Sequence, residues 1–337
     1  MRDPQINGGL PTRFVERLSE LVPPGRLPGV LAALAEPRAT GFRINRLRAD
    51  PGPVRAALEA EGLAPVPFEG VPGAYTVPDA HRRALTETAA CRDGEVYLQN
   101  PASMLPPRAL GPRPGERILD LAAAPGSKTL QLAELMDNQG WISAVESVRA
   151  RFFRLRANLE RHGAANVRTY LKDGTRVWRQ VPERFDRVLL DAPCSSEGQF
   201  QLGSPKSYRY WSERKIREMS RKQRRLLYSA VLCARSGGII VYSTCTLAPE
   251  ENEAVVDAML RRFGDALTIE PIAQAIPLGE PGHQSWRGDR YDASLRDAVR
   301  ILPDARLEGF FICRLRKHRS TLGDASGAAN GDDTRRD

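Results

Sequence analysis

The sequence predicts an open α/β fold with a doubly wound, mostly parallel sheet, and two observations support this prediction. From about residue 116 onward, short and almost continuously apolar segments alternate with longer segments of helical periodicity. Strands that are buried on both faces and alternate with helices are typical of parallel sheets covered by helices on both sides. In addition, each expected strand ends in polar, glycine or proline residues, as happens where the carboxyl ends of such strands face a ligand.

The main sheet is expected to contain five parallel strands and one late strand. The parallel strands are predicted at residues 118–122, 141–146, 167–173, 186–193 and 238–244. Helical periodicity predicts helices at residues 127–136, 148–162, 215–234 and 250–263. The late apolar segment at residues 309–316 is expected to join the sheet edge as an antiparallel strand.

The segments outside the main sheet suggest a division of the chain. Residues 14–21 and 54–60 have helical periodicity, and residues 40–47 alternate like a strand. Residues 320–337 contain almost no large apolar side chains, which is typical of disorder. We therefore predict a small α/β module over residues 1–100, a main domain over residues 101–318 and a disordered tail over residues 319–337.

Composition narrows the class of protein. A net charge of +9 favours a polyanionic partner, with nucleic acid ahead of an anionic membrane surface. The sequence contains no apolar run of about 18 residues and does not begin with an apolar leader, so we expect no membrane span and no secretory signal. Five scattered cysteines without a CxxC pair support neither a disulfide framework nor a zinc site. We expect a cytoplasmic monomer without a metal.

The turn after the first predicted strand reads DLAAAPGSKT, from Asp120 to Thr129. Its small residues allow a ligand to approach the backbone, and Gly126 and Ser127 begin a helix whose free N–H groups suit a carboxylate or phosphate. An ordinary strand-to-helix turn is the simpler alternative. A P-loop is excluded because Ser127 stands between the glycine and the lysine.

Two carboxylates follow the next two strands. Glu146 lies about 20 residues beyond Gly126, where an acid can accept hydrogen bonds from both ribose hydroxyls of a nucleoside cofactor. Asp173 is placed to meet an adenine edge, although a plain turn residue before Gly174 explains it equally well.

The fourth and fifth strands end in Asp191-Ala-Pro-Cys194 and Ser243-Thr-Cys245. If these strands are neighbours, two thiols and one carboxylate share one pocket. A free thiol is only slightly ionised at neutral pH, so a catalytic Cys245 needs local dipoles or positive charge. The remaining cysteines, namely Cys91, Cys233 and Cys313, are interpreted as small apolar residues.

Two stretches are strongly basic. Residues 206–225 hold nine Lys or Arg against two Glu, and residues 149–168 hold six Arg and one acid. Solvated helix faces would explain both. The interleaved aromatic side chains Tyr208, Tyr210 and Trp211 favour a nucleic-acid groove for the first stretch.

The motifs taken together resemble those of a known family. QNPASMLP, LDLAAAPGSKT, DAPCSSEG, YSTCTLAPEENEAVV and RILPDARLEGFFICRLRK, spread between about residues 10 and 317, are similar to motifs of the Sun-type RNA (cytosine-5) methyltransferases, and within them of the RsmF-like ribosomal RNA enzymes. The paired Pro-Cys and Thr-Cys turns are the most specific feature. One departure is that relatives usually have Gly in place of Ser195 or Ser196.

The resemblance implies a class I methyltransferase (Rossmann-like) fold behind an RNA-binding N-terminal module, with S-adenosylmethionine as cofactor. It implies that Glu146 holds the ribose, Asp173 the adenine, and that Asp191 lies beside the methyl donor and the base. Arg151 matches a family arginine less firmly. The methionine part of the cofactor is expected to contact Ala122, Ala123, Ala124, Pro125, Gly126, Ser127 and Lys128.

The resemblance also implies a reaction. Cys245 would add to carbon 6 of a cytosine, carbon 5 would take the methyl group, and Cys194 would remove the carbon-5 proton. Asp191 would hydrogen-bond to or protonate ring nitrogen 3. The expected partner is RNA, with 16S ribosomal RNA or the small ribosomal subunit first and transfer RNA second. The alternative from another class is a non-catalytic RNA-binding assembly factor.

Overall fold

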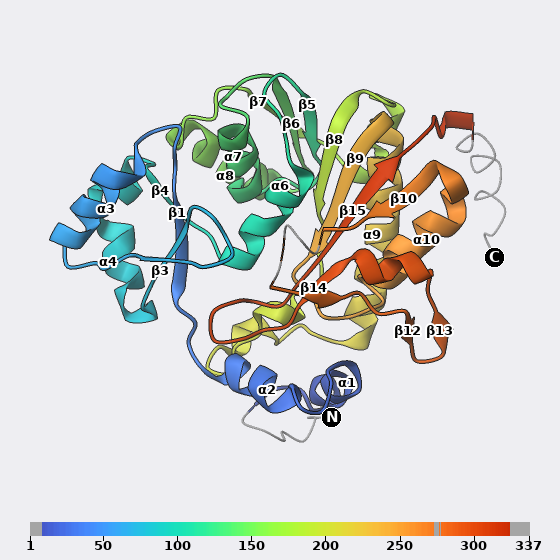
Figure 1. The fold of residues 1–337 in the computed structure, drawn as a ribbon, viewed down its shortest axis with the longest axis horizontal. Helices are drawn as coiled ribbons and strands as arrows, with labels where there is room; N and C mark the ends of the chain where they lie inside the picture. The colour runs from blue at the N-terminus through green and yellow to red at the C-terminus, as the bar shows by residue number, and fades with distance from the viewer. Residues whose placement is uncertain (1–8, 273–275, 277, 324–337) are drawn as a thin grey trace.

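The computed structural model describes residues 9–272, 276 and 278–323 (Figure 1). Its main sheet has the strand order β11-β14-β15-β9-β8-β5-β6-β7, with β10 paired to β15. The parallel strands are β5 (Arg117–Asp120), β6 (Trp141–Glu146), β7 (Val167–Leu171), β8 (Phe185–Asp191) and β9 (Ala234–Thr244). The predicted α/β class with a mostly parallel sheet is confirmed.

The antiparallel part of the sheet is larger than the single late strand that the sequence predicts. Strand β15 (Phe310–Lys317) pairs antiparallel with β9, as expected. The sheet then continues through three short antiparallel strands, which are β10 (Leu267–Glu270), β11 (Glu280–Pro281) and β14 (Val299–Ile301). Strands of two to four residues give too few alternations for a sequence pattern to reveal them.

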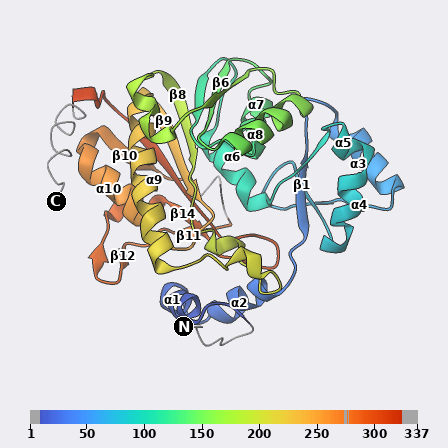
Figure 2. The same cartoon turned by 180° about the vertical axis from the view of Figure 1, so that it is seen from behind.

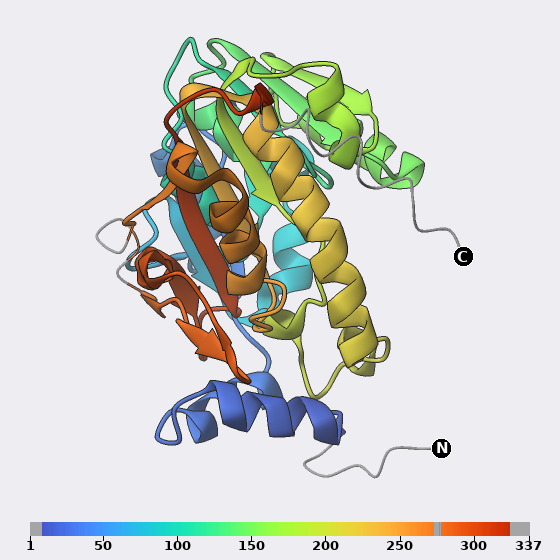
Figure 3. The same cartoon turned by 90° about the vertical axis from the view of Figure 1, so that its right-hand side faces the viewer.

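Helices cover both faces of the sheet, because successive strand residues point to opposite sides. Helices α9 (Glu213–Cys233) and α10 (Glu253–Phe263) pack on the face that includes Leu190 and Tyr242. Helices α6 (Leu105–Leu110) and α7 (Ser127–Leu135) pack on the opposite face, which includes Leu189 and Val241. Helix α8 (Arg149–Arg161) packs against Ala144 and Leu130. Figure 3 shows α9 and α10 lying side by side on their face.

A small antiparallel sheet forms a second body beside the main one (Figure 2). Its strand order is β2 (Val66–Pro67), β3 (Ala74–Val77), β1 (Thr40–Ile44) and β4 (Val96–Leu98). Helices α3 (Pro51–Ala60), α4 (Arg82–Glu87) and α5 (Ala89–Arg92) complete this module. Its core contains Phe42, Ile44, Val54, Leu58 and Leu85.

The first two helices do not pack on that module. Helices α1 (Thr12–Leu21) and α2 (Leu27–Ala35) lie below the main sheet in Figure 1, where Phe14 and Leu34 pack with Phe200, Leu247 and Trp286. The segment predicted as one N-terminal module therefore divides between two hydrophobic clusters. Trp286 belongs to a hairpin of β12 (Ser285–Trp286) and β13 (Asp289–Arg290).

Short 3-10 helices connect these elements. They are η1 (Asp79–His81), η2 (Pro101–Met104), η3 (Gly174–Arg179), η4 (Glu197–Gln199), η5 (Pro205–Ser207), η6 (Gly264–Ala266) and η7 (Ala293–Asp297).

The tail predicted to be disordered was residues 319–337, but the structure shows its first residues packed against the protein. Thr321 is buried, and its backbone N–H donates a hydrogen bond to Glu183. Lys317 also reaches Glu183, so this acid holds the chain in place after β15. The rest of the predicted tail, residues 324–337, lies outside the described residues. Within the described part of the chain, no helix is both long and apolar enough to cross a membrane.

Candidate active site

A cavity of about 900 Å³ lies at the carboxyl ends of the parallel strands. The segments that follow β5, β6, β7, β8 and β9 all contribute to its lining, through Ala122, Glu146, Asp173, Cys194 and Cys245. The opposite wall comes from the small module and its connection, with residues 38–41 and 97–100. A cavity therefore lies at the edge of the sheet where a ligand was predicted, and the N-terminal part of the chain forms its other wall.

The turn between β5 and α7 packs tightly around a glycine. Gly126 has a φ of +109°, and a Cβ atom there would lie 3.0 Å from Leu155 Cδ1, so a glycine fits best. At the start of the turn, Asp120 is buried and accepts a hydrogen bond from Thr129 at 2.7 Å. Burial raises the pKa of Asp120 to about 7.

The structure places five of the seven predicted turn residues at the cavity, namely Ala122, Ala124, Pro125, Ser127 and Lys128. Ala123 instead packs with Leu130 and Leu155, and Gly126 is buried beneath the turn. These two residues shape the turn but do not line the cavity.

Glu146 is almost completely buried at the end of β6, with its side chain on the cavity. Its carboxylate accepts a hydrogen bond from the Val148 N–H at 2.7 Å and lies 3.6 Å from the Arg151 guanidinium. Arg151 also donates to the Ala124 carbonyl at 2.6 Å. One arginine thus joins the two segments that were predicted to hold a nucleoside cofactor.

Asp173 fits both interpretations that the sequence left open. Its carboxylate caps η3 by accepting a hydrogen bond from the Thr175 N–H at 3.0 Å, as a turn residue does. The same side chain also lines the cavity.

Asp191 is held from both sides at the end of β8. The Lys128 ammonium lies 2.6 Å from one carboxylate oxygen, and the Ser243 hydroxyl donates to the other at 2.8 Å. Lys128 also donates to Ser103 at 2.7 Å. Lys128 was predicted to contact the cofactor's methionine part, and the structure shows it paired with Asp191. Ser103 was missed because nothing in the QNPASMLP segment says which of its side chains points to the cavity.

The two predicted thiols meet. The sulfur atoms of Cys194 and Cys245 lie 3.2 Å apart, and Ser196 Oγ is 3.5 Å from the Cys245 sulfur. The hydrogen bond with Cys245 and burial raise the pKa of Cys194 well above its usual value, and the nearby charge of Glu251 adds to this effect. The Cys194 thiol therefore keeps its proton at neutral pH.

The other cysteines lie away from the cavity. Cys233 and Cys313 are fully buried in the core between the sheet, α9 and α10, as predicted. Burial raises the pKa of Cys233 to about 12 and also raises the pKa of Cys313. Cys91 is only partly buried in α5, so the interpretation as a buried apolar residue is less apt there. Within the described residues, no cluster of His, Cys, Asp or Glu could hold a metal ion.

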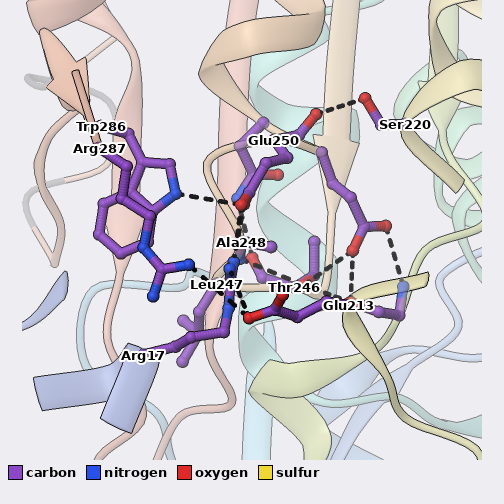
Figure 4. A network of polar contacts seen from close by, with 12 residues as sticks. Arg17, Glu213, Ser220, Thr246, Leu247, Ala248, Glu250, Trp286 and Arg287 are labelled. Carbon is purple, nitrogen blue, oxygen red and sulfur yellow. Dashed lines mark hydrogen bonds and ion pairs between the residues drawn. The ribbon is translucent and has the colours of Figure 1, made fainter. Parts of the chain in front are cut away.

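The segment that follows Cys245 is clamped by α1 and by the β12–β13 hairpin (Figure 4). Arg17 of α1 donates two hydrogen bonds to the Glu250 carboxylate, at 2.8 and 3.0 Å. The Trp286 indole donates to the same carboxylate at 3.1 Å, and Ser220 Oγ donates to the Glu250 carbonyl at 2.6 Å. Sequence patterns could not show this clamp because its partners are 30 to 233 residues apart.

The basic stretch at residues 206–225 is only partly a surface groove. Lys222 of α9 lines the cavity, and Tyr210 is 79% exposed. Tyr208, in contrast, is buried, and Trp211 packs against Phe14 and donates to Glu197. Two of the three aromatic residues that favoured a nucleic-acid groove therefore belong to the core beside α1.

An open α/β sheet with a cavity at its strand ends, a small-residue first turn and an acid at the end of the second strand are typical of a Rossmann-like domain that binds a nucleoside cofactor. A family model described as 16S rRNA methyltransferase RsmB/F matches residues 107–316. The chain belongs to this RsmB/F family, and the resemblance predicted from the motifs is confirmed. Its cofactor is S-adenosylmethionine.

Two named relatives show the range of the family. The chain is 40% identical, over 86% of its length and 91% of the relative's, to the tRNA (cytosine(49)-C(5))-methyltransferase of Pyrococcus abyssi. It is 35% identical, over 92% of its length, to the ribosomal RNA small subunit methyltransferase F of Serratia proteamaculans, of which it spans 64%. Both relatives are RNA methyltransferases, the enzyme class that the sequence predicts.

Solved structures agree on the fold. A methyltransferase homolog from Pyrococcus horikoshii is 30% identical with a TM-score of 0.76, and the match covers 91% of this chain and 99% of that one. NSun6 from the same organism, solved with SFG, has a TM-score of 0.77 over 93% of this chain and 99% of that one. At 22% identity the second likeness supports the fold alone.

Proposed function

We propose that this protein methylates carbon 5 of a cytosine in RNA and that Cys245 is the covalent nucleophile. The observation that carries the proposal is the pair of thiols 3.2 Å apart, beside the Asp191 carboxylate in one cavity. The relatives named as cytosine-5 methyltransferases of transfer RNA and as small-subunit ribosomal RNA methyltransferases support it.

The chemistry needs two sulfur atoms with different tasks. Cytosine carbon 5 is a weak nucleophile, and addition of the Cys245 thiolate to carbon 6 makes it electron-rich. Carbon 5 would then take the methyl group as the bond between that group and the sulfonium sulfur of its donor breaks, and Asp191 would hydrogen-bond to or protonate ring nitrogen 3. Cys194 takes the proton from carbon 5, and the bond between carbon 6 and Cys245 breaks, which restores the thiolate.

The geometry explains how Cys194 could change its role during one turnover. Its hydrogen bond with Cys245 is the largest cause of its raised pKa. Once the Cys245 sulfur is bonded to carbon 6, that sulfur no longer carries a charge or a proton to share. The pKa of Cys194 then falls, so that the thiol loses its proton more easily and its thiolate can act as the base that takes the carbon-5 proton.

The residues at the cavity fit S-adenosylmethionine, which supplies an electrophilic methyl group when bound. The buried Glu146 carboxylate suits the two ribose hydroxyls, and Asp173 suits the adenine. The backbone N–H groups at the start of α7 suit the carboxylate of the methionine part. Lys128 belongs to the Asp191 side of the cavity in this assignment.

The RNA partner has two candidates. The family model's description and the relative from Serratia proteamaculans favour 16S ribosomal RNA. The higher identity and fuller coverage of the Pyrococcus abyssi relative favour transfer RNA. In both cases we propose that the small module, within residues 1–100, binds the RNA beside the catalytic domain at 101–318. The proposed setting is a cytoplasmic monomer.

Bisulfite sequencing of total RNA tests this function. Cells with the gene should show one or more protected cytosines that are converted when the gene is deleted, and their position identifies the RNA. The gene carrying Cys91→Ala should restore protection, whereas Cys245→Ala should not. If no protected cytosine depends on the gene, the protein is not a cytosine-5 methyltransferase, and the assembly-factor alternative stands.

A further inference from the structure

A buried polar chain connects the two cysteine turns. Ser195 follows Cys194, and Thr246 follows Cys245; their hydroxyl oxygens lie 2.8 Å apart. Ser195 Oγ also contacts the Glu251 carboxyl, and Thr246 Oγ1 lies 3.1 Å from the Glu197 carboxyl. Through these contacts the four side chains run in the order Glu251, Ser195, Thr246, Glu197, with a carboxyl group at each end. A fourth and longer contact joins Thr246 Oγ1 to the Glu251 carboxyl at 3.5 Å.

Further contacts fix both ends of the chain. The Ser195 N–H and the Gln223 amide donate to Glu251 at 3.0 and 2.8 Å. The Trp211 indole donates to Glu197 at 2.8 Å. Both carboxyl groups are almost fully enclosed, so water can satisfy little of their hydrogen-bonding capacity.

One of the two carboxyl groups must be neutral, because the chain needs three protons for its hydrogen bonds. The three shorter contacts, between successive side chains of the chain, are hydrogen bonds between oxygen atoms, and each needs one proton. The two hydroxyl groups supply only two protons. The third must come from Glu251 or Glu197. Two ionised carboxylates would leave the Ser195 and Thr246 oxygens in contact without a proton between them, beside two buried negative charges.

We propose that Glu251, Ser195, Thr246 and Glu197 share one proton, that this chain fixes the spacing of the two cysteine turns, and that the position of the proton sets the charge beside Cys194. In the resting enzyme the proton lies on Glu251 and the negative charge on Glu197. The consequence for catalysis rests on the proposed function, because a neutral Glu251 allows Cys194 to ionise when it must act as a base.

The groups around the chain favour a proton on Glu251 and a negative charge on Glu197. Burial raises the pKa of Glu251 to about 8, and the charge of Glu197 adds to this effect. Burial also raises the pKa of Glu197, but the Trp211 hydrogen bond and the Arg17 charge oppose the rise. The other titratable groups that face the chain are Cys194, Tyr242 and Glu250. The positive charge near the chain comes from Arg17, and it acts on the Glu197 end.

Alkylation of Cys194 tests the proposal without RNA or methyl transfer. Purified protein carrying Cys245→Ala is treated with iodoacetamide between pH 6 and pH 10, and the modified Cys194 peptide is quantified. Adding E251Q should leave the rate unchanged near pH 7, where Glu251 is already neutral. Near pH 9 it should raise the rate about tenfold, the effect of lowering the Cys194 pKa by about one unit.

Two matched variants complete the test. E218Q removes an exposed carboxylate of α9 that pairs with Lys215 and does not contact the chain, and it should follow the parent protein at every pH. E197Q should act in the opposite direction to E251Q. Its amide donates toward Thr246 and turns the chain around, so Glu251 ionises at lower pH and Cys194 reacts more slowly near pH 7.

Unfolding gives a second readout. Because the pKa of Glu251 is raised from 4.5 to about 8 on folding, its contribution to stability is fully present below pH 4.5. This contribution is lost as the pH rises from there to about 8 and changes no further above that value. The wild-type protein should lose stability relative to E251Q over this range. Superimposed alkylation profiles for E251Q and its parent, or an equal shift in E218Q, would overturn the proposal. Failure of methylation with these shifts intact would overturn only the proposed function.

Discussion

Glu146, the side chain proposed to hold the ribose, is fixed in position by its neighbours. The carboxylate is buried, takes one backbone N–H from Val148 and sits near the Arg151 guanidinium. A carboxylate held in this way keeps its orientation without a large loss of entropy on binding.

Glu146→Gln should weaken binding of S-adenosylmethionine by about 10- to 100-fold, because hydrogen bonds to a charged group contribute about 1.5–3 kcal/mol. Isothermal titration of the purified protein measures this loss. Glu160→Gln, an exposed change on the following helix, is the control and should bind as the wild type does. Equal affinities in both variants would remove Glu146 from the cofactor site.

Residues at strand ends were predictable, and residues that reach the cavity from elsewhere were not. Cys194, Cys245, Glu146 and Asp191 follow apolar strands, so their convergence is a property of parallel sheets. Ser103, by contrast, reaches Lys128 from a 3-10 helix before the first parallel strand. No periodicity states where such a residue points, and only the folded chain brings it to Asp191.

At the scale of elements, the loop after Cys194 is fixed by a close contact between two glycines. The Gly198 N–H donates to the Cys245 carbonyl at 2.9 Å, and the Gly309 N–H donates to the Gly198 carbonyl at 3.0 Å. A Cβ atom on Gly198 would lie 2.1 Å from the Gly309 carbonyl oxygen. The η4 segment and the start of β15 therefore touch through their backbones.

Gly198→Ala should lower the free energy of unfolding by about 1–3 kcal/mol, the usual cost of overpacking. Both contacting atoms are backbone, so neither side can move aside as a flexible side chain would. Denaturant unfolding measures the loss. Gly203→Ala in the same loop region has open space around its new Cβ and should change stability little. Wild-type stability in Gly198→Ala would show that the two backbones separate easily.

The long helices and strands were predicted well because the hydrophobic periodicity that identifies each one lies within its own residues. The helix at Glu213–Cys233 and the strand at Trp141–Glu146 match their predicted ranges closely. The strands between residues 267 and 301 and the packing of α1 were not predicted. Those features depend on partners far away in sequence, such as the contact of Phe14 with Phe200.

At the scale of the whole molecule, the fold brings distant segments to one cavity. The two cysteines are 51 residues apart in sequence, and the neighbouring parallel strands β8 and β9 bring their sulfur atoms within 3.2 Å. The small module closes the cavity from the opposite side. The helix α1, which the sequence grouped with that module, instead holds the segment after Cys245 through Arg17 and Glu250. Catalysis as proposed depends on all three arrangements together.

Trapping of the covalent intermediate tests this account most directly. The Cys194→Ala protein, incubated with S-adenosylmethionine and the RNA that bisulfite sequencing identifies, should accumulate an RNA–protein adduct on a denaturing gel. The added change Cys245→Ala should abolish the adduct, and the wild-type protein should release its product. The account is contradicted if Cys194→Ala forms no adduct with an RNA that the wild type methylates, or if the adduct persists without Cys245. Either result would show that Cys245 is not the nucleophile or that Cys194 is not the base.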